Sequence, residues 1–120
     1  MKFLKVLPLL LSLTLTGCSA TVVLNAAPNA NDPGCAEVIV RLPQQTAQQP
    51  RRTTSAQSTA AWGDPTAVTL TCGLEPITVS ALPCITAGGV DWVVDETQKP
   101  NYRFISFGRN PATMVTMKSV

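Results

Sequence analysis

The residue with the clearest chemistry is Cys18, which ends the run Leu15-Thr16-Gly17-Cys18. An apolar residue three positions before a cysteine, with small residues between, marks a thiol that takes a diacylglyceryl group before the chain is cleaved on its N-terminal side. The chain opens with Lys2 and Lys5, and residues 6–15 are almost wholly apolar but too few for a permanent membrane span. Residues 1–17 are therefore predicted to be a lipoprotein signal peptide, and two acyl chains on Cys18 would anchor the mature chain stably. An ordinary signal peptide with a chance cysteine is the alternative.

Length and charge limit the possible functions of the mature chain. Cleavage would leave 120 − 17 = 103 residues, which is enough for one small domain. Removing Lys2 and Lys5 from nine basic residues, against seven acidic ones, leaves a side-chain charge of 9 − 2 − 7 = 0. A neutral domain gives no electrostatic reason to bind nucleic acid. We therefore expect no nucleic-acid partner, and contact with the membrane through the lipid on Cys18.

Three further cysteines, Cys35, Cys72 and Cys84, would be exported to a compartment where disulfides can form. Cys35 lies on the apolar stripe of a predicted helix, and Cys72 on the apolar face of a predicted strand, so this pair is favoured while the other pairings stay open. Cys84 would then be a free thiol, buried and inert. The chain has no histidine and none of these spacings is typical of zinc sites, so no metal and no cofactor are expected.

Catalysis would need an activated nucleophile or a carboxylate with a shifted pKa. Asp64 and Asp91 each lie close to a tryptophan, which could raise a carboxyl pKa in a cleft. A turn-forming Asp64 and a surface Asp91 on a strand are the simpler interpretations. Gly88-Gly89 lacks the lysine and the strand–helix context of a phosphate-binding loop. We therefore expect no catalytic residue.

Aromatic and basic side chains supply a candidate binding surface. Tryptophan is a frequent anchor at protein interfaces, although in a small domain it more often fills the core. Arg103 and Arg109 could bind an anionic envelope component, or could pair with Asp91 and Asp95 across strands. The candidate binding surface comprises Trp62, Asp64, Asp91, Trp92, Arg103 and Arg109.

The elements that would position these residues begin with a tether over residues 18–31. Asp32 and Pro33 are typical of a helix start, and Pro43 would end the helix. Its apolar stripe consists of Cys35, Val38, Ile39 and Leu42. A polar loop follows at about residues 44–58, in which Arg51-Arg52 is expected to be a solvated pair. Strands are then expected at 68–72, 90–94, 102–107 and 112–118, with a brief one at 77–79. The predicted fold of residues 32–120 is α+β, with one N-terminal helix packed on a small antiparallel β-sheet of about four strands.

Several short runs, taken in order, resemble a known family. They are Cys35 with Leu42-Pro43, then Ala60-Ala61-Trp62-Gly63-Asp64-Pro65, Leu70-Thr71-Cys72-Gly73, Gly89-Val90-Asp91-Trp92 and Gly108-Arg109-Asn110-Pro111-Ala112. Together they resemble the DUF3515 family of uncharacterised actinobacterial exported proteins, over about residues 33–118. The resemblance implies that the helix and strand cysteines recur together, which supports Cys35–Cys72. Thr71 and Met114 depart from the family pattern, which often has Arg and Glu at these positions.

The resemblance implies a location in the cell envelope and a fold, and it implies no activity. We expect a non-enzymatic lipoprotein on the outer face of the cytoplasmic membrane that binds or supports an unknown envelope protein or cell-wall component. The alternative is a small-ligand-binding protein or a cell-wall-acting enzyme that uses a carboxylate near Trp62 or Trp92.

Overall fold

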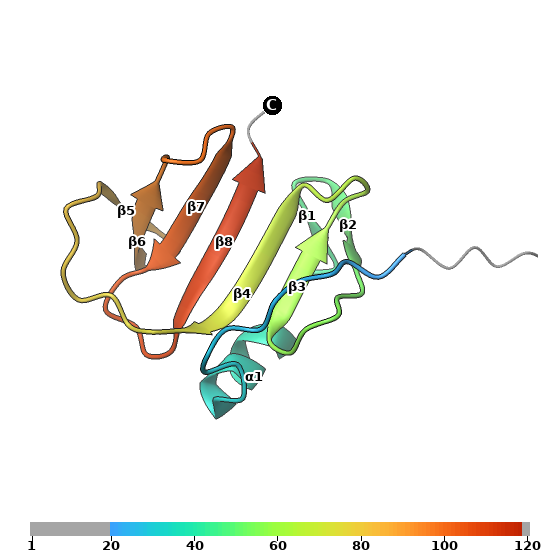
Figure 1. Cartoon of the computed structure of the whole chain (residues 1–120), viewed down its shortest axis with the longest axis horizontal. Coiled ribbons are helices and arrows are strands. Elements are labelled where there is room, and N and C mark those ends of the chain that lie inside the picture. Colours follow the sequence, from blue (N-terminus) through green and yellow to red (C-terminus); the bar gives the residue numbers. More distant parts are fainter. Residues whose placement is uncertain (1–19, 119–120) are drawn as a thin grey trace, which may run out of the picture.

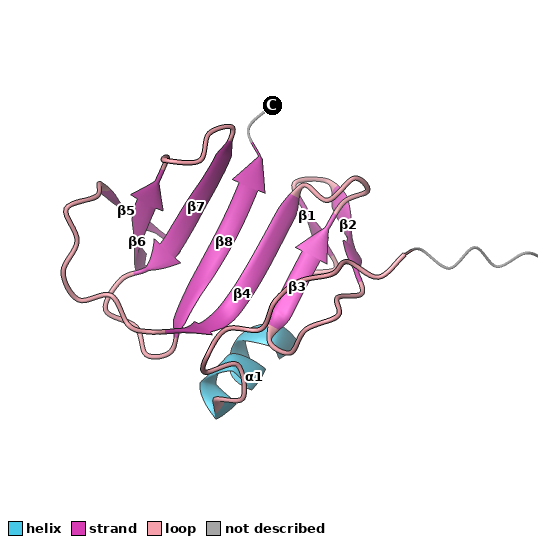
Figure 2. Ribbon diagram, viewed as in Figure 1, coloured by secondary structure: helices cyan, strands magenta, loops and turns pink. Residues whose placement is uncertain are grey.

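The computed structural model describes residues 20–118, so the predicted signal peptide and Cys18 lie outside the described residues. The described chain forms an eight-stranded antiparallel sheet with one short helix (Figures 1 and 2). The strands lie in the order β1–β2–β3–β4–β8–β7–β6–β5. The elements are α1 (Pro33–Val40), β1 (Gln45–Thr46), β2 (Gln49–Arg52), β3 (Thr59–Trp62), β4 (Val68–Leu74), β5 (Cys84–Ala87), β6 (Val90–Asp95), β7 (Asn101–Ser106) and β8 (Ala112–Lys118). No helix in this part of the chain has the length and apolar character needed to cross a membrane.

Helix α1 begins and ends where its sequence signals indicate. The Asp32 side chain accepts a hydrogen bond from the Gly34 amide at 2.8 Å, and Pro33 occupies the first helical turn. The helix stops at Val40, shortly before Pro43. A helix of eight residues has little stability of its own, so packing and a covalent bond must hold it in place.

A disulfide joins Cys35 of α1 to Cys72 of β4, with 5.6 Å between their Cα atoms, which confirms the predicted pair. Both cysteines are fully buried. The free thiol of Cys84 is exposed on β5, so the prediction that it is buried was wrong. The reason is its position on the outermost strand, where no neighbouring strand covers it.

The core lies between α1 and the β3–β4 part of the sheet. On the sheet side it contains four buried residues, Ala60, Trp62, Val68 and Leu70. Val38 and Ile39 of α1, together with Leu42 just after the helix, pack against them. The core thus lies toward one end of the sheet, and α1 appears beside β3 and β4 in Figure 1.

The predicted α+β fold with about four strands was wrong, because the sheet has eight strands and the helix is a minor element. Two of the additional strands, β1 and β2, lie within the predicted polar loop at 44–58. Because both strands are polar, they lack the apolar alternation by which strands are recognised in a sequence. The two turn residues between them, Ala47 and Gln48, both have positive φ, which is typical of a two-residue hairpin turn. Gly88 and Gly89 form the matching turn between β5 and β6.

Residues 20–31 do not run free of the domain as a tether would. The Val22 amide donates to the Thr53 carbonyl at 2.9 Å, and the Asn29 amide donates to the Gly73 carbonyl at 2.9 Å. Val22 and Leu24 line a hollow with Thr69 and Thr116, which alternate with the helix-facing residues of β4 and β8. The segment therefore packs on the sheet face opposite to α1. The lack of a side chain at Gly73 leaves room for the backbone of Asn29 and Ala30.

Candidate binding groove

Helix α1 covers one sheet face only over β3 and β4. Cross-strand pairing carries the helix-facing side from Leu70 of β4 to Val115 of β8, and from Val115 to Phe104 of β7. The same side continues along β6 and β5 through the pair Trp92 and Ile85. We call the part beyond α1 the uncovered face, which comprises Ile85, Trp92, Phe104, Val115 and Met117. Ile85 is 45% exposed and Met117 is 37% exposed, so large apolar side chains meet solvent here.

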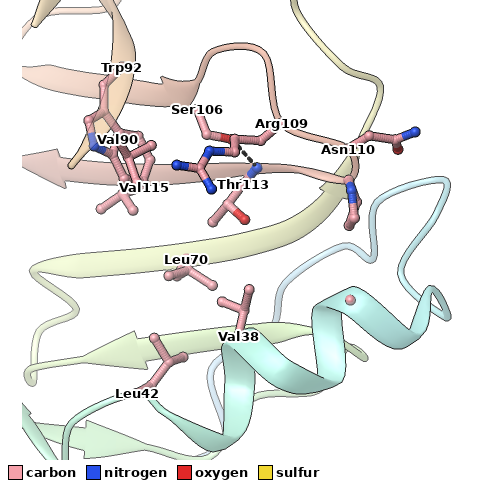
Figure 3. Close-up of a pocket in the computed structure, with 12 residues that line it drawn as sticks. Val38, Leu42, Leu70, Val90, Trp92, Ser106, Arg109, Asn110, Thr113 and Val115 are labelled. Atoms are coloured by element: carbon pink, nitrogen blue, oxygen red, sulfur yellow. Dashed lines mark hydrogen bonds between the residues drawn. The ribbon is translucent and has the colours of Figure 1, made fainter. Parts of the chain in front are cut away.

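A groove runs along the border between α1 and the uncovered face. It has a volume of about 560 Å³, and a second hollow of about 430 Å³ adjoins it over β5–β8. Trp92 and Val115 line both hollows, so the two form one continuous apolar surface. Figure 3 shows Val38 and Leu42 on the helix side of the groove, Leu70 between, and Trp92 with Val115 on the far side.

Arg109 is the one charged residue among those that line the groove of about 560 Å³. Its Nη2 donates a long hydrogen bond of 3.5 Å to the Gly89 carbonyl, and no carboxylate of residues 20–118 forms an ion pair with it. In Figure 3 its guanidinium lies near Ser106 and Thr113. The Ser106 hydroxyl is occupied, because it accepts a hydrogen bond from the Thr113 amide at 2.9 Å. The groove therefore offers a long apolar surface and one available cation.

The two tryptophans of the candidate binding surface do not meet. Trp62 is 2% exposed, and its Nε1 donates to the Pro43 carbonyl at 3.1 Å, so it belongs to the core. Trp92 lies on β6, four strand positions from β3. At about 4.8 Å per position, roughly 19 Å separates the two strands. A cleft between Trp62 and Trp92 with a carboxylate in it is therefore not formed.

The acidic candidates lie outside the groove. The Asp64 side chain is 81% exposed in the turn after β3, and its Oδ1 is 3.9 Å from Arg52 Nη1. Asp91 accepts a hydrogen bond from the Thr86 hydroxyl at 2.6 Å. Because Asp91 precedes Trp92 on the same strand, its side chain points to the opposite face.

Arg103 forms the cross-strand ion pair that the sequence suggested, with 2.7 Å between its Nη2 and Oδ2 of Asp95. Hydrogen bonds from the side chain and the backbone of Thr97, together with this pair, hold the pKa of Asp95 below its ordinary value. Arg103 alternates with Phe104 and so lies on the face away from the groove. Of the six candidate residues, the fold brings only Trp92 and Arg109 together.

The sequence interpretation missed most of the apolar residues that line the groove and the adjoining hollow, namely Val38, Leu42, Val90, Phe104, Val115 and Met117. The alternation of Thr113, Val115 and Met117 along the last strand was a usable signal for one of its walls. Residues 20–118 contain no group of three side chains that could hold a metal ion.

By its fold, the chain is a small domain built on one antiparallel β-sheet. A helix joined to the sheet by a disulfide covers one face over β3 and β4 and leaves the rest of that face open. The chain belongs to the family described as "Protein of unknown function (DUF3515)", which matches residues 12–119. No curated protein and no solved structure was found to match it. Thr71 and Met114, the positions at which the resemblance implied Arg and Glu, are direct cross-strand partners on β4 and β8. Arg and Glu at these positions would therefore face each other as a structural pair.

Proposed function

We propose that this chain is a non-enzymatic lipoprotein of the cell envelope, held on the outer face of the cytoplasmic membrane by lipid on Cys18. Its role is to bind an apolar segment of an envelope protein along the groove and the uncovered face. The observation that carries this proposal is the incomplete cover of the sheet, where one helix packs on β3 and β4 while the continuous apolar surface over β5–β8 stays open.

The size and chemistry of the surface support a protein segment as the occupant. A contiguous apolar surface of this kind is typical of interaction sites and is rare as ordinary exposed surface. Trp92 provides an aromatic anchor near its centre, and its Nε1 donates to the Ala87 carbonyl at 3.3 Å. Arg109, without a carboxylate partner among the described residues, can form a charge-assisted hydrogen bond with an acidic or carbonyl group of the bound segment.

The enzymatic alternative depends on a carboxylate near one of the tryptophans. Neither Asp64 nor Asp91 lines the groove, and no carboxylate stands among its lining residues. The observations therefore favour binding. Incubation of the mature protein with cell-wall material tests the alternative, since turnover that is lost in Asp64→Asn or Asp91→Asn would overturn our proposal.

Photo-crosslinking in intact cells tests the binding surface. Ile85 and Thr86 are adjacent, exposed residues of β5 whose side chains point to opposite faces, so they form a matched pair of probe positions. A photoreactive side chain at position 85 should give a discrete adduct with one envelope protein, and Trp92→Ala should reduce that adduct at least about tenfold. The same probe at position 86 should give no such adduct. Equal labelling from both positions would contradict the proposal.

Metabolic labelling tests the anchor separately. Cells grown with an alkyne fatty acid should incorporate it into the wild-type chain, and Cys18→Ser should abolish the incorporation. A mature wild-type chain with an unmodified thiol at position 18 would refute the anchored location and leave the groove unaffected.

A further inference from the structure

The first described residues of the chain are fixed to the domain by Arg52. This side chain is only 11% exposed, and its Nη2 donates to the Ala20 carbonyl at 2.6 Å. Its Nη1 donates to the Gly63 carbonyl at 3.1 Å and to the Thr66 hydroxyl at 3.3 Å. One buried guanidinium thus joins Ala20 to the turn that follows β3. We call Ala20, Arg52, Gly63 and Thr66 the clamp.

The residues after Ala20 continue this attachment. Val22 donates to the Thr53 carbonyl at 2.9 Å and accepts from the Ser55 amide at 3.0 Å, which makes a short parallel bridge beside β2. The Leu24 amide donates to the Ser55 hydroxyl at 3.0 Å. The main chain is therefore held from Ala20 onward, and a long spacer is missing where a tether had been expected.

Covalent geometry then limits how far the domain can stand from its anchor. Ala20 is 20 − 18 = 2 residues from Cys18. Two residues span at most about 7 Å when fully extended. We propose, on the basis of the proposed lipidation of Cys18, that the lipid seats the domain directly on the bilayer, with the clamp and the β2 end of the sheet against the lipid headgroups.

The side chains at this end suit a lipid surface. Val23 is 82% exposed and lies three residues from the clamp carbonyl, where it can enter the apolar edge of the headgroup layer. Lys118 lines a hollow together with Val22 and Thr66, so it lies close to the clamp on the same face of the sheet. Its cationic group matches the phosphates of anionic lipids.

This seating places β5 far from the membrane. In the sheet order, β5 lies six strand positions from β2, which corresponds to roughly 29 Å along the sheet. In Figure 1 the described chain begins on the β2 side, and β5 lies on the opposite side. The uncovered face would then point sideways, parallel to the membrane plane, and its β5 end would stand away from the bilayer.

Short-range quenching of a fluorophore by headgroup-labelled lipids tests this arrangement on the full lipoprotein, reconstituted in vesicles of neutral and anionic phospholipid. One sample carries the dye on the natural exposed thiol of Cys84. The other carries it on Asp64→Cys in a Cys84→Ser background, because the Asp64 side chain is 81% exposed beside the clamp. We expect quenching at position 64 to exceed that at position 84 at least threefold. Equal weak quenching, or stronger quenching at position 84, would overturn the inference.

A spacer supplies the control. Ten Gly-Ser residues inserted between Ser19 and Ala20 leave every clamp contact in place but lengthen the reach, and should lower quenching at position 64 to the level of position 84. The same insertion between Gly88 and Gly89 should change nothing. The mass of the reconstituted protein separates the proposed lipidation of Cys18 from the proposed seating on the bilayer. A chain without the diacylglyceryl group refutes the lipidation and the seating together, whereas a lipidated chain with unquenched dyes refutes the seating alone.

Discussion

Replacing Gly73 of β4 by alanine should destabilise the domain more than the same change at Gly88, in the turn between β5 and β6. Gly73 lies in the bulge of β4, with a φ of +110° that side chains rarely adopt. A Cβ atom here would lie 2.5 Å from the carbonyl carbon of Asn29 and 2.6 Å from the amide nitrogen of Ala30. Both are backbone atoms, so no side chain can rotate away to make room.

The expected magnitude has two parts. The backbone conformation costs about 1–2 kcal/mol for an L-residue, and forcing extra volume into a packed site costs about 1–3 kcal/mol more. We therefore expect Gly73→Ala to lower the free energy of unfolding by roughly 2–5 kcal/mol. For a domain of about 100 residues this lowers Tm by at least about 8 °C.

Gly88→Ala is the matched control, because Gly88 has a φ of +61° and no atom lies within 4 Å of the place that an alanine methyl group would occupy. It should show the conformational cost of about 1–2 kcal/mol without the clash. The assay is thermal unfolding of the oxidised mature chain, followed by circular dichroism, with Cys18→Ser in every sample. If both variants lost the same stability, the close approach of residues 20–31 to β4 would be refuted.

Three further outcomes follow from the structure. Cys35→Ser should lower the free energy of unfolding by about 3.8 kcal/mol, the chain-entropy value for a separation of 37 residues, whereas Cys84→Ser should leave urea unfolding nearly unchanged. Because the folded-state pKa of Asp95 is lowered, its stabilising effect is present above the unfolded pKa near 3.9 and is lost as pH falls through the folded pKa. The Tm of the wild type should therefore fall more steeply below about pH 4 than that of Asp95→Asn, and matching slopes would contradict the assignment. Thr71→Arg with Met114→Glu should show a favourable coupling of about 0.2–1 kcal/mol in a double-mutant cycle, as expected for a structural cross-strand pair, and zero coupling would place the two side chains apart.

Local signals in the sequence were enough to predict the helix, and they favoured the Cys35–Cys72 disulfide without excluding the other pairings. Asp32 and Pro33 set the start of α1, and the stripe that contains Cys35 decides which side of the helix meets the sheet. Alternation also located the longer strands, because one side of each is apolar. These features depend on neighbours within a few residues, which a single sequence displays directly.

The strand count and the groove depend on distant partners and could not be predicted in this way. β1 and β2 are polar and are stabilised by pairing with neighbouring strands, and β3 (Thr59–Trp62) was not among the predicted strands. The groove arises because β8 lies between β4 and β7, which brings Trp92 and Arg109 from later parts of the chain opposite α1. Residue type singled out these two side chains as candidates, but it also selected Trp62, which lies in the core.

Cys72 and Gly73 connect the two faces of β4 to the same short stretch of chain, residues 29–35, through a covalent bond on one side and close backbone contact on the other. If Cys18 carries the proposed lipid, a pulling force on that lipid would therefore act on β4 of the sheet. The hydrogen bonds that hold residues 20–31 to the sheet would break first, and the Cys35–Cys72 disulfide would then prevent further unfolding. The protein would resist tension from the membrane as long as this bond remained oxidised.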